Sequence, residues 1–329
     1  MRRADPVEQR LGDGTEQPAA DEVVTATTQA FLRRLIALQD SLPHHPDKPN
    51  ESAEATLRVL WHLAAGCALS VVAAARVPLP ALSSSAEALL DGYISQRLSG
   101  QPLAHLSQRQ HFMGLEMLAG PQALIPRLET EQLGQVALSL LQSVKQAVVL
   151  DLCTGCGNLA LALAHHAPQA RVMGGDVCAE AIALAHRNAE HLGLSQRVAF
   201  RVGDLFEPFQ DADLRGQIDL IVCNPPYISS GKIDSLPFEI HGHEPRVAFD
   251  GGPLGIKVLR RLLREAPLFL RPGGWLALEV GRGQGQSVLQ CLRALTSPHI
   301  SGASAFEPAI SACDAAGDIR VVMARRSLP

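Results

Sequence analysis

Leu220-Ile221-Val222-Cys223-Asn224-Pro225-Pro226-Tyr227 joins an apolar run to a rigid polar turn. The apolar residues predict a buried strand of a parallel sheet. Pro225 and Pro226 end that strand, because proline cannot donate to a sheet ladder and its ring fixes φ. The turn is therefore expected at the carboxyl end of a strand, where open α/β sheets bind ligands.

The polar groups of this turn suit a planar ligand that carries an NH2 group. Asn224 offers an amide donor and acceptor, Pro225 and Pro226 offer main-chain carbonyls, and Tyr227 offers a flat ring. The alternative is a strand end followed by a Pro-Pro turn and a tyrosine that only packs. Because Asn224 and Tyr227 flank the prolines and a glycine-rich turn lies upstream, we interpret the segment as a binding site.

From Ala147 onward, strand and helix patterns alternate, which predicts a doubly wound parallel sheet. The expected strands are residues 148–151, 171–176, 198–203, 218–223, 275–280 and 319–324, with 301–310 as a possible partner of the last. The expected helices are residues 129–144, 159–167, 179–192, 257–270 and 286–295.

The first hundred residues carry helical patterns and no strand signal. Residues 1–20 are polar and are expected to form a disordered tail. Helices are expected over residues 21–40 and 51–75, the second with Asn50 or Ser52 as N-cap, and a third is capped by Ser83-Ser84-Ser85. Residues 105–124 mix apolar residues with glycine and proline, which predicts a β-hairpin that connects two domains.

A second candidate site is Asp151-Leu152-Cys153-Thr154-Gly155-Cys156-Gly157, between the first strand and the first helix of the sheet domain. Its glycines permit a tight turn, and the helix N-terminus supplies free N–H groups. Gly155-x-Gly157-x-x-Ala160, with Asp176 roughly 20 residues further on, formally satisfies the dinucleotide fingerprint. An NAD-linked oxidoreductase is therefore one alternative.

Two acidic residues favour S-adenosylmethionine over a dinucleotide. Asp151 precedes the glycines, where a carboxylate suits a sulfonium and an amino group better than a pyrophosphate. Asp204-Leu205 follows the third expected strand and can hold the edge and face of an adenine. Hydride transfer also needs an acid–base residue, and neither His241 nor His243 has a convincing partner.

Composition limits the remaining classes of protein. The chain has 329 residues, 47% of them hydrophobic, and a net charge of −4, so no global basic field attracts nucleic acid. Seven scattered cysteines suit a reducing cytosol, and Cys153-x-x-Cys156 lacks the second pair that a zinc site needs. No signal peptide is evident, and residues 59–75 are too short for a membrane span. We expect a cytoplasmic protein with no metal and no membrane contact.

Further motifs lie along the chain, and the most specific is Leu124-Ile125-Pro126-Arg127-Leu128-Glu129-Thr130-Glu131. The others are Arg97-Leu98-Ser99-Gly100-Gln101-Pro102-Leu103, His243-Glu244-Pro245-Arg246-Val247-Ala248-Phe249-Asp250-Gly251-Gly252, Arg271-Pro272-Gly273-Gly274 and residues 314–320. With residues 151–157 and 224–227, they resemble the release-factor glutamine N5-methyltransferases, the HemK-like family of S-adenosylmethionine enzymes. The resemblance covers residues 52–325.

This resemblance implies an architecture and a reaction. It implies a helical substrate-recognition domain (21–104), a β-hairpin linker (105–125) and a Rossmann-like methyltransferase domain with a seven-stranded sheet (126–329). The implied substrate is the glutamine of a Gly-Gly-Gln loop in peptide chain release factors, and the implied product is S-adenosylhomocysteine. Residues 224–227 and Arg127 are expected to hold the glutamine. With the carboxylates named above included, ten residues are expected to bind the cofactor: Asp151, Cys153, Thr154, Gly155, Cys156, Gly157, Asp176, Asp204, Leu205 and Asn224.

An amide nitrogen is a poor nucleophile, so the reaction needs positioning more than a strong base. Asn224 Oδ1 and the Pro225 carbonyl are expected to accept its two N–H groups, while Tyr227 packs on the amide plane. These acceptors also favour the partial positive charge that develops on nitrogen. Asn224, Pro225 and Tyr227 are therefore the predicted catalytic residues.

The chain departs from the family pattern at several positions. Leu128 stands where proline is usual, His105 stands near a usual tyrosine, and Cys153 stands where glycine is common.

Three alternative functions remain open: glutamine methylation of a ribosomal protein, adenine-N6 methylation of nucleic acid, and non-catalytic binding of S-adenosylmethionine. The lack of a Lys/Arg run speaks against nucleic acid.

Overall fold

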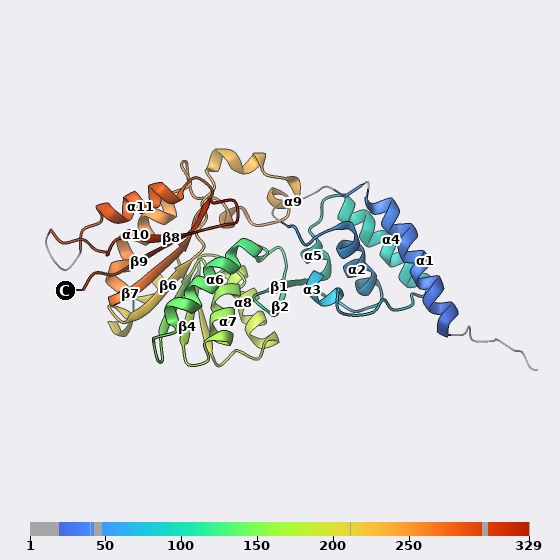
Figure 1. Ribbon diagram of the computed structural model, residues 1–329, viewed down its shortest axis with the longest axis horizontal. Coiled ribbons are helices and arrows are strands. Elements are labelled where there is room, and N and C mark those ends of the chain that lie inside the picture. The colour runs from blue at the N-terminus through green and yellow to red at the C-terminus, as the bar shows by residue number, and fades with distance from the viewer. Residues whose placement is uncertain (1–19, 40, 43–47, 211, 298–301, 329) are drawn as a thin grey trace, which may run out of the picture.

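The computed structural model describes residues 20–39, 41–42, 48–210, 212–297 and 302–328. A helical bundle and a sheet domain lie at opposite ends of the molecule, with a small hairpin between them (Figure 1). The expected disordered tail, apart from Ala20 at the start of the first helix, lies outside the described residues. No helix within the described part of the chain is both long and apolar enough to cross a lipid bilayer.

Within the described residues, five helices form the bundle, and two of the predicted caps are present. Ser52 and Ser83 are N-caps whose side chains accept hydrogen bonds from main-chain N–H groups three residues on. The helices are α1 (Ala20–Gln39), α2 (Ala53–Ala64), α3 (Val71–Ala74), α4 (Ser84–Leu98) and α5 (Leu103–Ser107).

The prediction of a single helix over residues 51–75 is wrong. The chain leaves α2 after Ala64, passes through Gly66 at φ +82°, and re-enters a helix only at Val71, with Ser70 as a new N-cap. A left-handed glycine ends a helix readily, and the Ser70 side chain then starts another. Both helices bury apolar side chains in the same bundle core, so the apolar pattern continues through the break.

The hairpin of β1 (Arg109–Phe112) and β2 (Leu115–Leu118) lies between the two ends of the molecule (Figure 1). The Glu116 carboxylate accepts hydrogen bonds from the main-chain N–H and the hydroxyl of Ser70, both at 2.6 Å, which ties the hairpin to the bundle. The Leu118 N–H donates to Asn188 Oδ1 at 2.6 Å, which ties it to the sheet domain. The first residues of the expected linker are instead the end of α5.

The sheet has seven strands in the order β5-β4-β3-β6-β7-β9-β8, which confirms the predicted Rossmann-like α/β class. The first five strands in this order, β5, β4, β3, β6 and β7, run parallel, and β9 is antiparallel to both β7 and β8. Their bounds are β3 (Val148–Leu152), β4 (Arg171–Asp176), β5 (Val198–Val202), β6 (Ile218–Cys223), β7 (Leu270–Glu279), β8 (Ile310–Cys313) and β9 (Ile319–Arg325).

Two strand predictions need correction. β7 begins at Leu270 rather than Trp275, because Pro272 and Gly273 form an irregularity within the strand instead of a turn before it. The expected partner of the last strand, residues 301–310, is only partly right: β8 begins at Ile310 and continues to Cys313, while Phe306 forms an isolated bridge with Arg326 just beyond β9. Asp314 Oδ1 accepts the N–H groups of Ala316 and Asp318, and this tight turn pairs the residues directly before it with β9.

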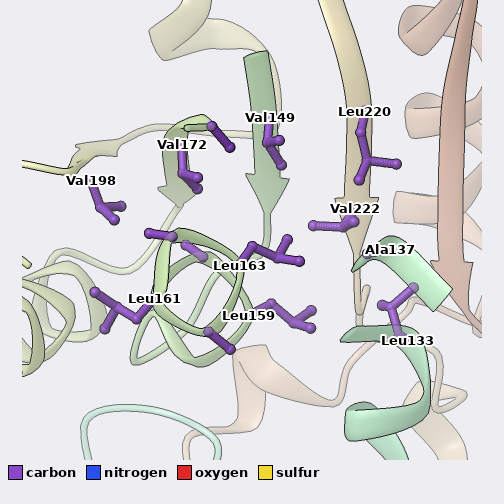
Figure 2. Packing of buried hydrophobic residues seen from close by; sticks show 14 of the residues in the cluster. Leu133, Ala137, Val149, Leu159, Leu161, Leu163, Val172, Val198, Leu220 and Val222 are labelled. Carbon is purple, nitrogen blue, oxygen red and sulfur yellow. The ribbon is translucent and has the colours of Figure 1, made fainter. Parts of the chain in front are cut away.

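Helices cover both faces of the sheet. On one face, Leu159, Leu161 and Leu163 of α7 pack beside buried valines and leucines of the strands and of α6 (Figure 2). Each such buried side chain contributes about 1.5–3 kcal/mol. The first face carries α6 (Leu128–Leu141), α7 (Asn158–His166) and α8 (Ala179–His191), and the second carries α10 (Lys257–Phe269) and α11 (Gly285–Ala294).

The strand order reverses between β3 and β6, which places a ligand crevice outside the carboxyl ends of these two strands. The sequence predicted no regular elements for the segment between β6 and α10. This segment forms short turns and the small helix α9 (Phe238–His241), which lies on the side of the sheet domain nearer the bundle (Figure 1). Hydrophobic periodicity does not predict such short elements, because none of these helical turns exceeds six residues.

Candidate functional site

Asn224 lies where two adjoining clefts meet at the carboxyl ends of β3 and β6. The first cleft, of about 770 Å³ including its open mouth, is lined by the glycine-rich turn and the ends of β4 and β6. The second, of about 640 Å³, is lined by the Pro-Pro-Tyr turn, the start of α6 and the end of β7. Leu124, Asn224 and Ala248 line both. A group bound in one cleft can therefore meet a group bound in the other beside Asn224.

The first cleft brings six of the ten predicted cofactor residues to its wall: Cys153, Gly155, Asp176, Asp204, Leu205 and Asn224. Gly155 has φ +55°, and a side chain there would meet no atom closer than 4.0 Å, so a ligand can approach this backbone closely. The other four residues, Asp151, Thr154, Cys156 and Gly157, do not line this cleft, and all four are buried.

Asp151 stabilises the glycine-rich turn through hydrogen bonds to the turn and to the helix that follows it. Its Oδ2 accepts hydrogen bonds from the Thr154 hydroxyl at 2.5 Å and from the Ala160 N–H at 3.1 Å. Complete burial raises the pKa of this carboxyl to about 7 despite those two bonds. The structure therefore gives Asp151 a role in shaping the turn, and direct contact with a ligand stays a prediction.

Asp176 ends β4 and organises the rim of the first cleft. Its Oδ2 accepts the Gly155 N–H and its Oδ1 accepts the Cys178 N–H, both at 2.9 Å. Burial raises its pKa although these bonds favour the charged form. Each carboxylate oxygen keeps a second lone pair, which suits the acceptance of ligand hydroxyl groups.

Asp204 and Leu205 form the opposite part of the wall. Asp204 Oδ2 accepts a hydrogen bond from Arg261 Nη1 at 2.5 Å, so α10 takes up part of its capacity as an acceptor. Leu205 adopts φ +51° and is almost fully buried, which presents an apolar surface to the cleft. The carboxylates of this cleft, with its apolar patch, suit a ligand that carries hydroxyl, amino or cationic groups and a flat ring.

The second cleft holds the side-chain amide of Asn224 in one orientation. Its Nδ2 donates to the Thr130 hydroxyl at 3.1 Å, and Thr130 is only 2% exposed. The Oδ1 atom is then the half of the amide left to accept a hydrogen bond from a ligand. The sequence places Thr130 in the Leu124–Glu131 motif but indicates no role for it, because no local pattern shows that it meets Asn224.

Glu279, at the end of β7, is a buried acid that the sequence reasoning missed. It lines the second cleft, accepts a hydrogen bond from the Tyr227 hydroxyl at 3.5 Å, and lies 3.9 Å from Arg320 Nη2. Burial raises the pKa of Glu279, while a hydrogen bond from Thr130 and the charge of Arg320 oppose that rise. Burial, followed by the nearby Glu279, raises the pKa of Tyr227 to about 12, so its hydroxyl stays protonated.

Arg127 reaches the second cleft with the support of Glu244. Its Nη2 donates to Glu244 Oε1 at 2.5 Å, while Glu244 Oε2 accepts the Ile125 N–H at 2.8 Å. One buried carboxylate thereby fixes both the backbone and the guanidinium of the Ile-Pro-Arg segment. Of the predicted substrate residues, Arg127, Pro225 and Tyr227 line the second cleft, whereas Pro226 lines the first.

The two thiols of the Cys153-x-x-Cys156 pair belong to different apolar clusters. Among the side chains that the structure describes, no group of three or more His, Cys, Asp or Glu residues could hold a metal ion.

Comparison with known proteins bears on the fold and on the class of protein. A family profile described as a methyltransferase domain matches residues 143–296. The hMettl16 catalytic domain, solved in complex with MAT2A 3'UTR hairpin 1, superposes with a TM-score of 0.52 at 15% identity, covering 70% of this chain and 83% of that one. This likeness shows the fold alone.

Curated relatives are more specific. A release factor glutamine methyltransferase from Moorella thermoacetica is 42% identical over 203 residues, which cover 61% of this chain and 70% of that protein. The protein of the same name from Bradyrhizobium diazoefficiens is 36% identical over 247 residues, covering 74% and 81%. The family profile and these relatives thus define a methyltransferase. The chain belongs to the release factor glutamine methyltransferase family.

Proposed function

We propose that this chain transfers a methyl group from S-adenosylmethionine to the side-chain amide nitrogen of the glutamine in the Gly-Gly-Gln loop of peptide chain release factors. The first cleft would hold the cofactor and release S-adenosylhomocysteine, and the second would hold the glutamine. The observation that carries the proposal is the position of Asn224, which lines both clefts. Because the release factor, both before and after methylation, acts in translation, we place the reaction in the cytoplasm.

The first cleft fits this cofactor on the chemistry of its wall. Asp176 has lone pairs for ribose hydroxyls, Leu205 gives an apolar surface for the adenine, and Gly155 leaves room beside its backbone. When bound, S-adenosylmethionine supplies an electrophilic methyl group on a cationic sulfur. Asp176 and its neighbours then act by binding and orienting, with no acid–base step of their own.

The second cleft supplies the positioning that a weak nucleophile needs. Thr130 engages the nitrogen of the Asn224 amide, so Oδ1 can accept one N–H of the glutamine amide. The Pro225 carbonyl can accept the other, and the Tyr227 ring can cover the amide plane. Alignment of this kind contributes up to about 7–11 kcal/mol to a reaction. The methylated nitrogen is strongly acidic and can lose its proton to water.

The competing substrates can be separated in one experiment with methyl-labelled S-adenosylmethionine. The chain is incubated separately with a release factor, a ribosomal protein fraction and duplex DNA, and the label in each is counted. We expect label in the release factor, and none in a release factor whose Gly-Gly-Gln glutamine is replaced by alanine. Label that enters the DNA or ribosomal proteins, with an unlabelled release factor, would refute the proposed substrate.

A further inference from the structure

Two cysteine thiols meet beneath the first cleft. Cys223 ends β6, and it is paired in register with Leu152 of β3, the residue that directly precedes Cys153. Cys153 packs against the apolar cluster that contains Cys223, which brings the two side chains close together. The ends of two neighbouring strands therefore bring two sulfur atoms together directly before Asn224.

The two thiols differ in exposure. Cys153 is half-buried and lines the first cleft, whereas Cys223 is completely buried. Burial, followed by the neighbouring Cys153 thiol, raises the pKa of the Cys223 thiol well above its usual range, so Cys223 keeps its proton until a leaving group takes it. A small oxidant that enters the cleft therefore reaches Cys153 first, and a second thiol lies behind it at the end of the neighbouring strand.

The backbone at Cys153 supports a role for its side chain. Cys153 has φ +57°, a left-handed conformation in which a side chain is strained and glycine is favoured. Residues held in such conformations cluster at functional sites. The structure thus holds a thiol in the glycine-rich turn where glycine would be the relaxed choice.

We propose that Cys153 and Cys223 form a reversible disulfide, driven by a peroxide, that switches the transferase off. The Cys153 sulfur attacks one peroxide oxygen, the O–O bond breaks, and water leaves once the thiol proton is taken up. The resulting sulfenic acid is attacked by the Cys223 sulfur, whose proton leaves with the hydroxyl group as a second water. Two thiols are oxidised and one peroxide is reduced, which gives one disulfide and two waters.

This bond would act at both parts of the site. It would pin the first residue of the turn that lines the first cleft to the residue directly before Asn224. Disulfides in reducing compartments are typically transient and regulatory, which fits a switch rather than a structural bond.

The test exposes the full-length protein to hydrogen peroxide, blocks the remaining thiols with an alkylating agent and identifies linked peptides by mass spectrometry. We expect one peptide pair linked through Cys153 and Cys223, lighter by two hydrogen atoms and restored by dithiothreitol. Methyl transfer should fall to near background in the oxidised protein and return fully on reduction. A link from Cys153 to Cys156 or Cys178, or no link while Cys153 becomes sulfinic acid, would overturn the proposal.

Two variants separate the thiols, each compared with its own untreated activity. Cys223→Ala should form no link, and its loss of activity in peroxide should resist dithiothreitol, because Cys153 proceeds to the sulfinic acid. Cys153→Gly should keep its activity in peroxide. Peroxide inactivation of Cys153→Gly, or full recovery of oxidised Cys223→Ala by dithiothreitol, would contradict the proposal. Because linked peptides are detected without any substrate, a failed methylation assay leaves this test intact.

Discussion

The side-chain nitrogen of Asn224 donates a hydrogen bond to the Thr130 hydroxyl across 3.1 Å, which joins the end of β6 to the first turn of α6. An amide can rotate by half a turn and exchange its oxygen and nitrogen, and this bond favours one of the two orientations. The orientation that it favours leaves Oδ1 for the substrate.

Replacing Thr130 by valine should slow methyl transfer without weakening cofactor binding. Thr130→Val keeps the shape of the side chain and removes the hydroxyl, so the Asn224 amide loses its partner. A lost hydrogen bond to a buried group costs about 1–3 kcal/mol, or roughly 5- to 150-fold in kcat/KM. Steady-state kinetics checks this, with Thr130→Ser as the control that keeps the hydroxyl. Equal activity of the valine and serine variants would show that this contact does not orient Asn224.

Removing the Asn224 side chain should abolish methyl transfer and leave the fold intact. Asn224→Ala deletes the predicted acceptor for the glutamine amide, while the rest of the turn keeps its contacts, such as the 2.9 Å hydrogen bond from Gln284 Nε2 to the Tyr227 carbonyl. Circular dichroism and a thermal melt should match the wild-type protein. Retained turnover in this variant would refute the mechanism.

Asp176 should contribute to cofactor affinity. Asp176→Ala is expected to weaken binding of S-adenosylmethionine by roughly 1–3 kcal/mol, because ligand hydroxyls lose their acceptor. The variant also frees the Gly155 and Cys178 N–H groups, so a thermal melt should accompany the calorimetric titration. Asp176→Asn keeps one acceptor oxygen and should lose less affinity. Unchanged affinity in a folded Asp176→Ala protein would count against placing the ribose here.

A buried ion cluster joins the bundle to the sheet domain, and it should make stability depend on pH. Glu239 of α9 accepts hydrogen bonds from Lys48 and, at 2.8 Å, from Arg97 Nη1, while Arg97 Nη2 lies 3.2 Å from Glu51. Burial opposes ionisation of Glu239, but Lys48 and Arg97 outweigh it and lower its pKa below the ordinary 4.5. A lowered pKa stabilises the fold above that ordinary value. This stability is lost as the pH falls through the folded value.

Neutralising Glu239 tests this cluster. Glu239→Gln leaves two buried cations with one carboxylate fewer and should destabilise the protein by about 3–5 kcal/mol at neutral pH. Below pH 4.5 the difference from wild type should shrink. Denaturant unfolding across this pH range measures it, with the exposed Asp234→Asn as the matched control, expected to cost about 1 kcal/mol or less. A pH-independent difference would show that charge at Glu239 is not the cause.

Much of the sheet domain could be predicted from the sequence, because its parallel strands are short apolar runs bounded by glycine, proline and acidic residues. The apolar run before Asn224 and the turn at Gly155 locate β6 and β3, and the resemblance supplies the number of strands. The break within residues 51–75 was missed, because apolar periodicity does not register one left-handed glycine. The buried partners Thr130 and Glu279 were missed for another reason. They act on Asn224 and Tyr227 only after distant segments come together, which no local pattern encodes.

The most direct measurement of the central claim is mass spectrometry of a release factor after incubation with S-adenosylmethionine and either the wild-type protein or Asn224→Ala. The peptide that contains Gly-Gly-Gln is fragmented to locate any added mass. One methyl group on the glutamine side chain, with wild type alone, is the predicted result. No methyl group on that glutamine, while the wild-type protein still binds S-adenosylmethionine, would contradict the proposed substrate and the role given to the second cleft.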